Sequence, residues 1–100
     1  MALGFYHPTD KRHQHLLFQL DNLELESLDD VMKEYKRRTG LYLDPYRDTY
    51  LYQDHINLLV QLMGEQLNYL TKNKHAETIR LQGIISKFSL ATDGLLAIGD

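Results

Sequence analysis

The chain has 100 residues, of which 43% are hydrophobic and 25% charged, and it contains no cysteine. This length and composition predict one domain over residues 1–100 that folds on its own. Without cysteine, disulfides, thiolate zinc sites and cysteine nucleophiles are excluded, and a reducing compartment, by default the cytoplasm, is favoured. The net charge of −3 argues against a nucleic-acid binder, and no apolar run is long enough to span a membrane.

The first patterned segment follows a short apolar start. Residues 7–23 predict a helix capped by Thr9, with Leu16, Leu17 and Leu20 on one face. The same stretch also alternates from Leu16 to Leu20, so a strand there remains open as the alternative.

A second helix is predicted from about Leu28 to Arg38. Ser27 followed by Asp30 resembles a capping box, and Gly40 lies where a left-handed C-cap is needed. The basic run KEYKRR could contact nucleic acid, but its position in the last turn favours compensation of the helix dipole.

The next segment, GLYLDPYRDTYLYQDH, changes from helical to strand-like spacing. Pro45 and its flanking aspartates predict a turn, and either a short β-hairpin or a pair of extended arms over about residues 41–52. Near the other end of the sequence, residues 95–98 form an apolar run bounded by glycines, which predicts a buried strand paired with this segment.

Two antiparallel helices are predicted between these extended segments. One apolar stripe begins at Gln53 and ends near residues 71–74, and a second runs from Ile79 to Ala91. The expected fold is therefore α+β and mostly helical. It has three to four helices and a small sheet or hairpin at about residues 41–52 and 95–98.

The histidines do not form a diagnostic catalytic or metal-binding pattern. His13 and His15, with His7 nearby, could share an ion only if they lay on a strand. Asp54 and His55 are adjacent, so on a helix they would not face each other, and no serine or cysteine is placed as a nucleophile. Asp54 fits better as a first-turn residue. We therefore expect no catalytic residue, no metal site and no cofactor.

Tyrosines and leucines alternate in the extended segment. If the leucines are core residues, the tyrosines are exposed beside carboxylates, a composition typical of protein-binding hot spots. The alternative left open is that helices cover the tyrosines. The aspartates lack the spacing of a calcium loop. The candidate partner-binding residues are Tyr42, Asp44, Tyr46, Arg47, Asp48, Tyr50 and Asp54.

The run TGLYLDPYRDTYLYQDHINLLVQLM (residues 39–63) and the sequence GLLAIGD (residues 94–100) resemble small bacterial immunity proteins of contact-dependent growth-inhibition and polymorphic toxin systems. The resemblance implies a cytoplasmic, non-catalytic protein that binds and neutralises one cognate toxin domain, with a nuclease among the candidates. Strongly acidic nuclease inhibitors carry more charge than −3. We expect a monomer or weak homodimer with no nucleic-acid or membrane partner.

Two other functions remain open at this point. One is a helical scaffold or homodimer whose partner face is the stripe from Ile79 to Leu96. The other is a small metal-dependent hydrolase that uses His13, His15 and His55.

Overall fold

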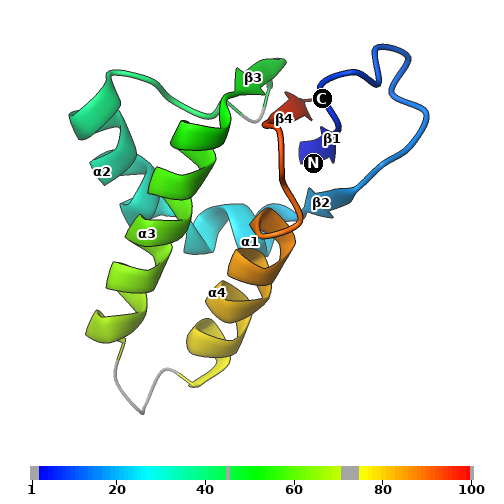
Figure 1. Cartoon of the computed structure of the whole chain (residues 1–100). Coiled ribbons are helices and arrows are strands. Elements are labelled where there is room, and N and C mark those ends of the chain that lie inside the picture. Colours follow the sequence, from blue (N-terminus) through cyan, green and yellow to red (C-terminus); the bar gives the residue numbers. More distant parts are fainter. Residues whose placement is uncertain (1–2, 45, 71–74, 100) are drawn as a thin grey trace.

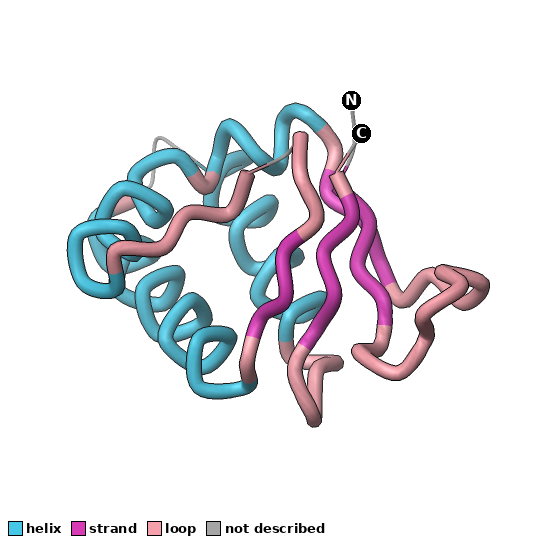
Figure 2. The backbone as a smooth tube through the Cα atoms, turned by 90° about the horizontal axis from the view of Figure 1, so that it is seen from above, coloured by secondary structure: helices cyan, strands magenta, loops and turns pink. Residues whose placement is uncertain are grey.

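The computed structural model describes residues 3–44, 46–70 and 75–99. Within these residues the chain forms four helices and one antiparallel sheet of four strands, which confirms the predicted α+β class. The elements in chain order are β1 (Leu3–Tyr6), β2 (Phe18–Leu20), α1 (Asn22–Ser27), α2 (Asp29–Thr39), β3 (Thr49–Leu51), α3 (Gln53–Tyr69), α4 (His75–Phe88) and β4 (Leu95–Ile98). The helices cover one face of the sheet, and Figure 2 shows the strands from the opposite side.

The core lies between the sheet and the helices. Alternate strand residues face the helices and are buried, because successive side chains of a strand point to opposite faces. These inward residues are Leu3, Phe5, Phe18, Leu20, Leu51, Leu95 and Ala97. The rings of Phe5, Phe18 and Phe88 have their centroids 4.5 to 5.3 Å apart, so α4 is packed directly onto β1 and β2. Each such large side chain contributes roughly 1.5–3 kcal/mol by its burial.

The strand order β2-β1-β4-β3 places the first and last strands side by side in the middle of the sheet (Figure 1). In β1 and β4, Gly4 faces Ile98 and Tyr6 faces Leu96. On the other side of β4, Tyr50 of β3 also faces Leu96. The predicted pairing of residues 95–98 with the tyrosine-containing segment is therefore confirmed, and β3 is an edge strand.

Of the two alternatives for residues 41–52, the hairpin is not formed, because among the described residues of this segment only Thr49–Leu51 form a strand. Asp44 bends the chain, since its Oδ1 accepts the backbone N–H of Tyr46 at 2.8 Å and its carbonyl accepts that of Arg47 at 3.2 Å. Residues 41–44 therefore do not pair with the sheet. Pro45, the expected turn residue, lies outside the described residues.

The predicted helix over residues 7–23 was also wrong in its first part. The carboxylate of Asp10 accepts the backbone N–H groups of Gln14 and His15 at 3.1 and 2.8 Å, which satisfies these donors without a helix. His13 has a φ of 53°, which a regular helix does not allow. These contacts hold the segment in a loop between β1 and β2.

The alternative of a strand within residues 16–20 is confirmed by β2. Thr9 does not cap a helix, and its hydroxyl instead lies 2.7 Å from Nδ1 of His7. The strand β1 was not predicted, although Leu3 and Phe5 alternate with small or polar neighbours.

The helix α1 was also missed, although its capping box is present in the sequence. Asp21 accepts the N–H of Glu24 at 2.8 Å, and the Glu24 carboxylate accepts the N–H of Asp21 at 3.1 Å. The capping box predicted at Ser27 was wrong. Its hydroxyl donates to the Leu23 carbonyl within α1, and α2 begins after Leu28 without a side-chain cap.

The remaining helix predictions agree with the structure. Gly40 adopts the predicted left-handed C-cap with a φ of 75° and ends α2 one residue beyond Arg38. The helix α3 begins at Gln53 as expected and ends at Tyr69, shortly before the predicted end at residues 71–74, which lie outside the described residues. The helix α4 ends at Phe88 rather than near Ala91. No helix in the described ranges is long and apolar enough to cross a membrane.

Gly94, which begins the turn into β4, is a position where only glycine fits. Its φ is 92°, and an added Cβ would lie 2.6 Å from the carbonyl oxygen of Leu51. We expect Gly94→Ala to lower the free energy of unfolding by roughly 2 kcal/mol or more, as measured by urea denaturation.

Gly83→Ala is the matched control, because Gly83 lies in α4 and nothing surrounds its Cβ position within 4 Å. This variant should gain about 0.5–1 kcal/mol from the higher helix propensity of alanine. Equal stability of the two variants would contradict the close approach at Gly94.

Candidate protein-binding surface

Four tyrosines around β3 are exposed to solvent. The exposed fractions of Tyr42, Tyr46, Tyr50 and Tyr52 are 52, 65, 46 and 63%. The alternative that helices cover these rings was therefore wrong. We call the set Tyr42, Asp44, Tyr46, Arg47, Asp48, Tyr50, Tyr52 and Asp54 the tyrosine surface. Tyr52 was not among the predicted site residues, although it lies in the same alternation two positions after Tyr50.

The leucines of the same segment are mostly turned inward. Leu43 and Leu51 are 4 and 1% exposed and belong to the hydrophobic core. Leu41 departs from the alternation, since it is 45% exposed and directly follows the helix end at Gly40. The buried leucines fix this stretch against the core, so the tyrosines between them are held at the surface.

Aromatic contacts hold several of these rings in place. The ring centroids of Tyr50 and Tyr52 are 4.8 Å apart in an edge-on arrangement, and Tyr52 is 5.8 Å from His55. His55 in turn lies 6.3 Å from the buried ring of Tyr35. This row of rings connects the edge strand to the core, so Tyr50 and Tyr52 are restricted before any partner binds.

Two polar atoms at the inner end of this row lack a hydrogen bond. The Tyr35 hydroxyl and Nδ1 of His55 are buried and have no partner among the residues that the structure describes. Burial raises the pKa of the Tyr35 phenol. The imidazole ring of His55 lies between the rings of Tyr52 and Tyr35.

The charged residues of the surface have different surroundings. Asp44 accepts the turn hydrogen bonds described above and lies 3.6 Å from Nε of Arg47, so this pair partly neutralises itself. The Nζ of Lys36 lies 5.7 Å from the ring centroid of Tyr42, which is within cation–π range. Asp54 lies in the first turn of α3 as predicted, where its charge complements the helix dipole.

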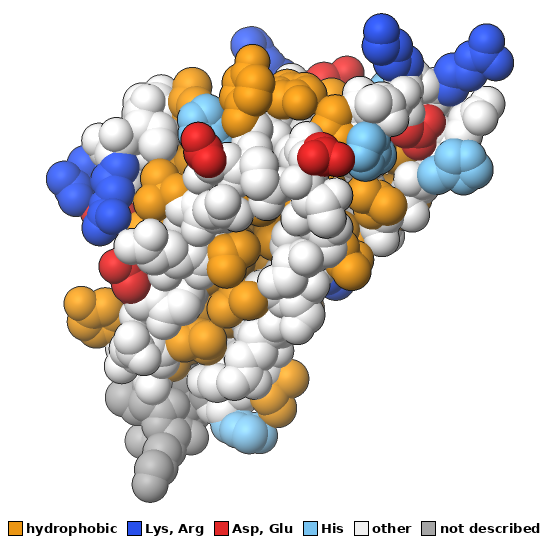
Figure 3. Space-filling view, viewed as in Figure 1, with side chains coloured by type: hydrophobic (Ala, Val, Ile, Leu, Met, Phe, Trp, Pro, Cys, Tyr) orange, Lys and Arg blue, Asp and Glu red, His pale blue; other side chains and the backbone are white. Residues whose placement is uncertain are grey.

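Asp48 and Asp54 have no ion pair within the described ranges, so the surface combines aromatic rings with carboxylates that lack a cationic partner there. Figure 3 shows hydrophobic side chains, tyrosine included, gathered over β3 and the start of α3. Most lysines and arginines on this face lie at its far corners, over the end of α2 and over the loop between β1 and β2 (Figure 3). Among the carboxylates of the tyrosine surface, Asp44 is the one with an ion pair in the described part of the chain, to Arg47.

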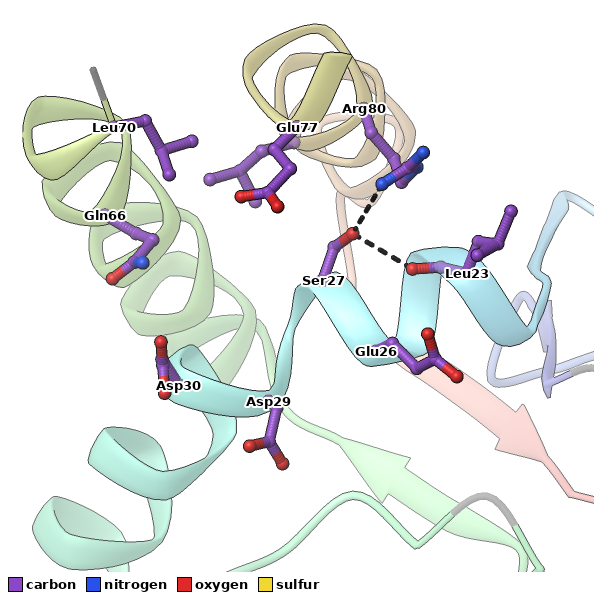
Figure 4. Close-up of a pocket in the computed structure, with 10 residues that line it drawn as sticks. Leu23, Glu26, Ser27, Asp29, Asp30, Gln66, Leu70, Glu77 and Arg80 are labelled. Carbon is purple, nitrogen blue, oxygen red and sulfur yellow. Dashed lines mark hydrogen bonds between the residues drawn. The ribbon is translucent and has the colours of Figure 1, made fainter. Parts of the chain in front are cut away.

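A hollow of about 360 Å³ lies at the opposite end of α3 from the tyrosine surface. It is bordered by α1, the first turn of α2, the end of α3 and α4 (Figure 4). Arg80 donates to the Ser27 hydroxyl at 3.3 Å, and that hydroxyl donates to a backbone carbonyl, so Ser27 is not free to act as a nucleophile. No histidine lines the hollow, and its carboxylates are Glu26, Asp29, Asp30 and Glu77.

The histidine hypothesis gains no support from the geometry. His13 and His15 lie in the loop between β1 and β2, and the ring centroids of His13 and Tyr6 are 5.2 Å apart. His7 is 3.9 Å from Asp93. Among residues 3–44, 46–70 and 75–99, no group of three or more histidine or carboxylate side chains is arranged to hold a metal ion.

The stripe proposed for a helical scaffold is already used inside the fold. Leu81, Ile84 and Phe88 are buried in the core, while Ile79 at the start of the stripe is exposed. The middle of this stripe is therefore covered by the chain itself, while Ile79 and Leu90 are exposed.

Comparison with known protein families, with curated proteins and with solved structures finds no match to this chain.

The alternation of buried leucines with exposed tyrosines around β3 predicts how substitutions there affect stability. Leu51→Ala should lower the free energy of unfolding by about 2–4 kcal/mol, because it leaves a cavity under β3. Tyr46→Ala should change it by less than about 0.5 kcal/mol, because its ring is exposed. Thermal or urea unfolding of both variants tests this, and a large loss in Tyr46→Ala would mean that the ring serves the fold rather than a partner.

Proposed function

We propose that this protein is a non-catalytic immunity protein that binds one cognate bacterial toxin domain in the cytoplasm and neutralises it. The observation that carries a binding role is the exposure of four tyrosines beside unpaired carboxylates on one edge of the sheet. The choice of a toxin as the partner rests on the resemblance of residues 39–63 and 94–100 to immunity proteins.

The physical properties of the tyrosine surface support tight protein binding. Tyrosine offers a large, amphipathic contact area with few rotatable bonds, and it is enriched among hot-spot residues. Tyr50 and Tyr52 already contact each other in the free protein, so less side-chain entropy is lost on association. Such pre-organisation favours affinity at a surface of modest size.

The charge of the surface supports a basic partner. Asp48 and Asp54 have no cation of their own in the described part of the chain, and a partner with lysines or arginines would supply one. Opposite charges speed association and exclude wrongly charged partners. A toxin domain with a basic active site, such as a nuclease, is the partner that this chemistry favours.

The double variant Tyr46→Ala/Asp48→Ala should weaken binding to the cognate toxin domain by about 2 kcal/mol or more. Calorimetry on purified proteins measures the affinity, and co-expression with the toxin measures protection of cells. We expect the wild type to protect and the double variant to protect less.

The matched control is Tyr69→Ala/Glu77→Ala. Tyr69 lies outside the tyrosine surface and is 80% exposed, and Glu77 borders the hollow at the far end of α3. This control removes one tyrosine and one carboxylate outside the tyrosine surface and should bind as the wild type does. If wild-type protein gives no protection, immunity is abandoned; if only the control loses affinity, the interface lies at the far end of α3.

A further inference from the structure

The backbone N–H and C=O groups of the sheet alternate in direction from β2 to the edge at β3. The carbonyl of Phe5 accepts the N–H of Leu17 at 2.9 Å, so the main chain of Phe5 is turned toward β2. In an antiparallel sheet, successive residues turn their N–H and C=O groups to opposite sides. Gly4 and Tyr6 are therefore turned toward β4, where Tyr6 faces Leu96.

The same alternation continues through β4 to the edge. The backbone N–H and C=O groups of Leu96 point toward β1. Those of Leu95 therefore point toward β3, where Leu95 faces Leu51. An independent observation agrees, because the carbonyl oxygen of Leu51 lies 2.6 Å from the Cβ position of Gly94 and is thus turned toward β4. It follows that Tyr50, the middle residue of β3, turns its backbone N–H and C=O away from the sheet.

The two edges of the sheet differ at this middle position. On β2 the equivalent residue is Gln19, and its carbonyl accepts a hydrogen bond from Nζ of Lys87 at 3.0 Å. That ammonium group also pairs with Glu24 at 2.6 Å, so this edge is occupied by a fixed charge. On β3, no hydrogen bond to the N–H or C=O of Tyr50 is present within the described ranges.

We propose that β3 binds an extended segment of the toxin domain as a fifth strand, with the residue opposite Tyr50 exchanging both backbone hydrogen bonds with it. This inference rests on the proposed function and identifies how that partner is held. Strand addition of this kind takes affinity from main-chain bonds and specificity from alternate side chains. The edge is only three residues long, so side-chain contacts must contribute as well.

The surroundings of the edge define the segment that fits. Side chains of the added strand that point to the same face as Tyr50 would contact the rings of Tyr50 and Tyr52, which favours an apolar or aromatic residue there. Asp48 directly precedes β3 and has no ion pair in the described part of the chain, which favours a lysine or arginine at the neighbouring position. The expected segment is therefore extended, with one apolar residue followed or preceded by a basic one.

Two substitutions at the same residue separate the backbone contribution from that of the ring. Tyr50→Ala removes the ring and keeps the N–H, whereas Tyr50→Pro removes both. Proline is tolerated on an edge strand where its missing N–H faces outward, so Tyr50→Pro should retain the fold. We expect Tyr50→Pro to bind the toxin domain about tenfold or more weakly than Tyr50→Ala. Equal affinities of two folded variants would overturn strand addition.

If Tyr50→Pro does not fold, amide hydrogen exchange of the wild-type protein tests the same backbone contact. In the free chain, the Tyr50 amide should exchange much faster than that of Leu51, and the toxin domain should slow it by about a hundredfold or more. A complex that forms without protecting this amide overturns strand addition while leaving the immunity function in place. Failure of the wild type to bind the toxin domain removes both proposals. Without toxin, exchange of the Tyr50 amide could instead become slower as the protein concentration rises, and light scattering could give the mass of a dimer. Both results together would show that a second copy pairs with the edge and would overturn the proposal that a toxin segment does.

Discussion

The pairing of β1 with β4 is the interaction on which the rest of the structure depends. These strands are far apart in the sequence and form the middle of the sheet, so each carries one further strand on its outer side. Leu3, Phe5, Leu95 and Ala97 of this pair are all fully buried against the helices. Without it, the sheet would separate into two pairs of strands, β2 with β1 and β4 with β3, and an isolated pair of strands is marginal in water.

The same pairing determines what β3 presents to solvent. Register with β4 turns Leu51 into the core and Tyr50 to the outer face, since a shift of one residue would exchange the two. The backbone direction of Tyr50 follows from that register as well. The exposed ring of Tyr50 and its outward-turned backbone are thus two results of one alignment.

Local patterns predicted the structure where one physical effect dominated. The left-handed cap at Gly40, the start of the helix at Gln53 and the strand at residues 95–98 each follow from chain chemistry within a few residues. The loop around Asp10 was not predicted. One carboxylate there accepts two backbone N–H groups, and this outweighs the helical spacing of the leucines. The exposure of the tyrosines was undecided in the sequence, since it depends on which face the helices cover. The free backbone of Tyr50 depends on strand order, which a single sequence does not reveal.

The position of β4 also has a consequence for synthesis of the chain. During translation, β1 emerges well before its neighbour β4, which is formed by residues 95–98. Until then the inward residues of β1 and β2 have no complete sheet to join, and contacts between such distant segments form slowly. The edge at Tyr50 is built on β4, so it exists only after this late step. A nascent chain would therefore become competent for binding only once residues 95–98 have joined the sheet.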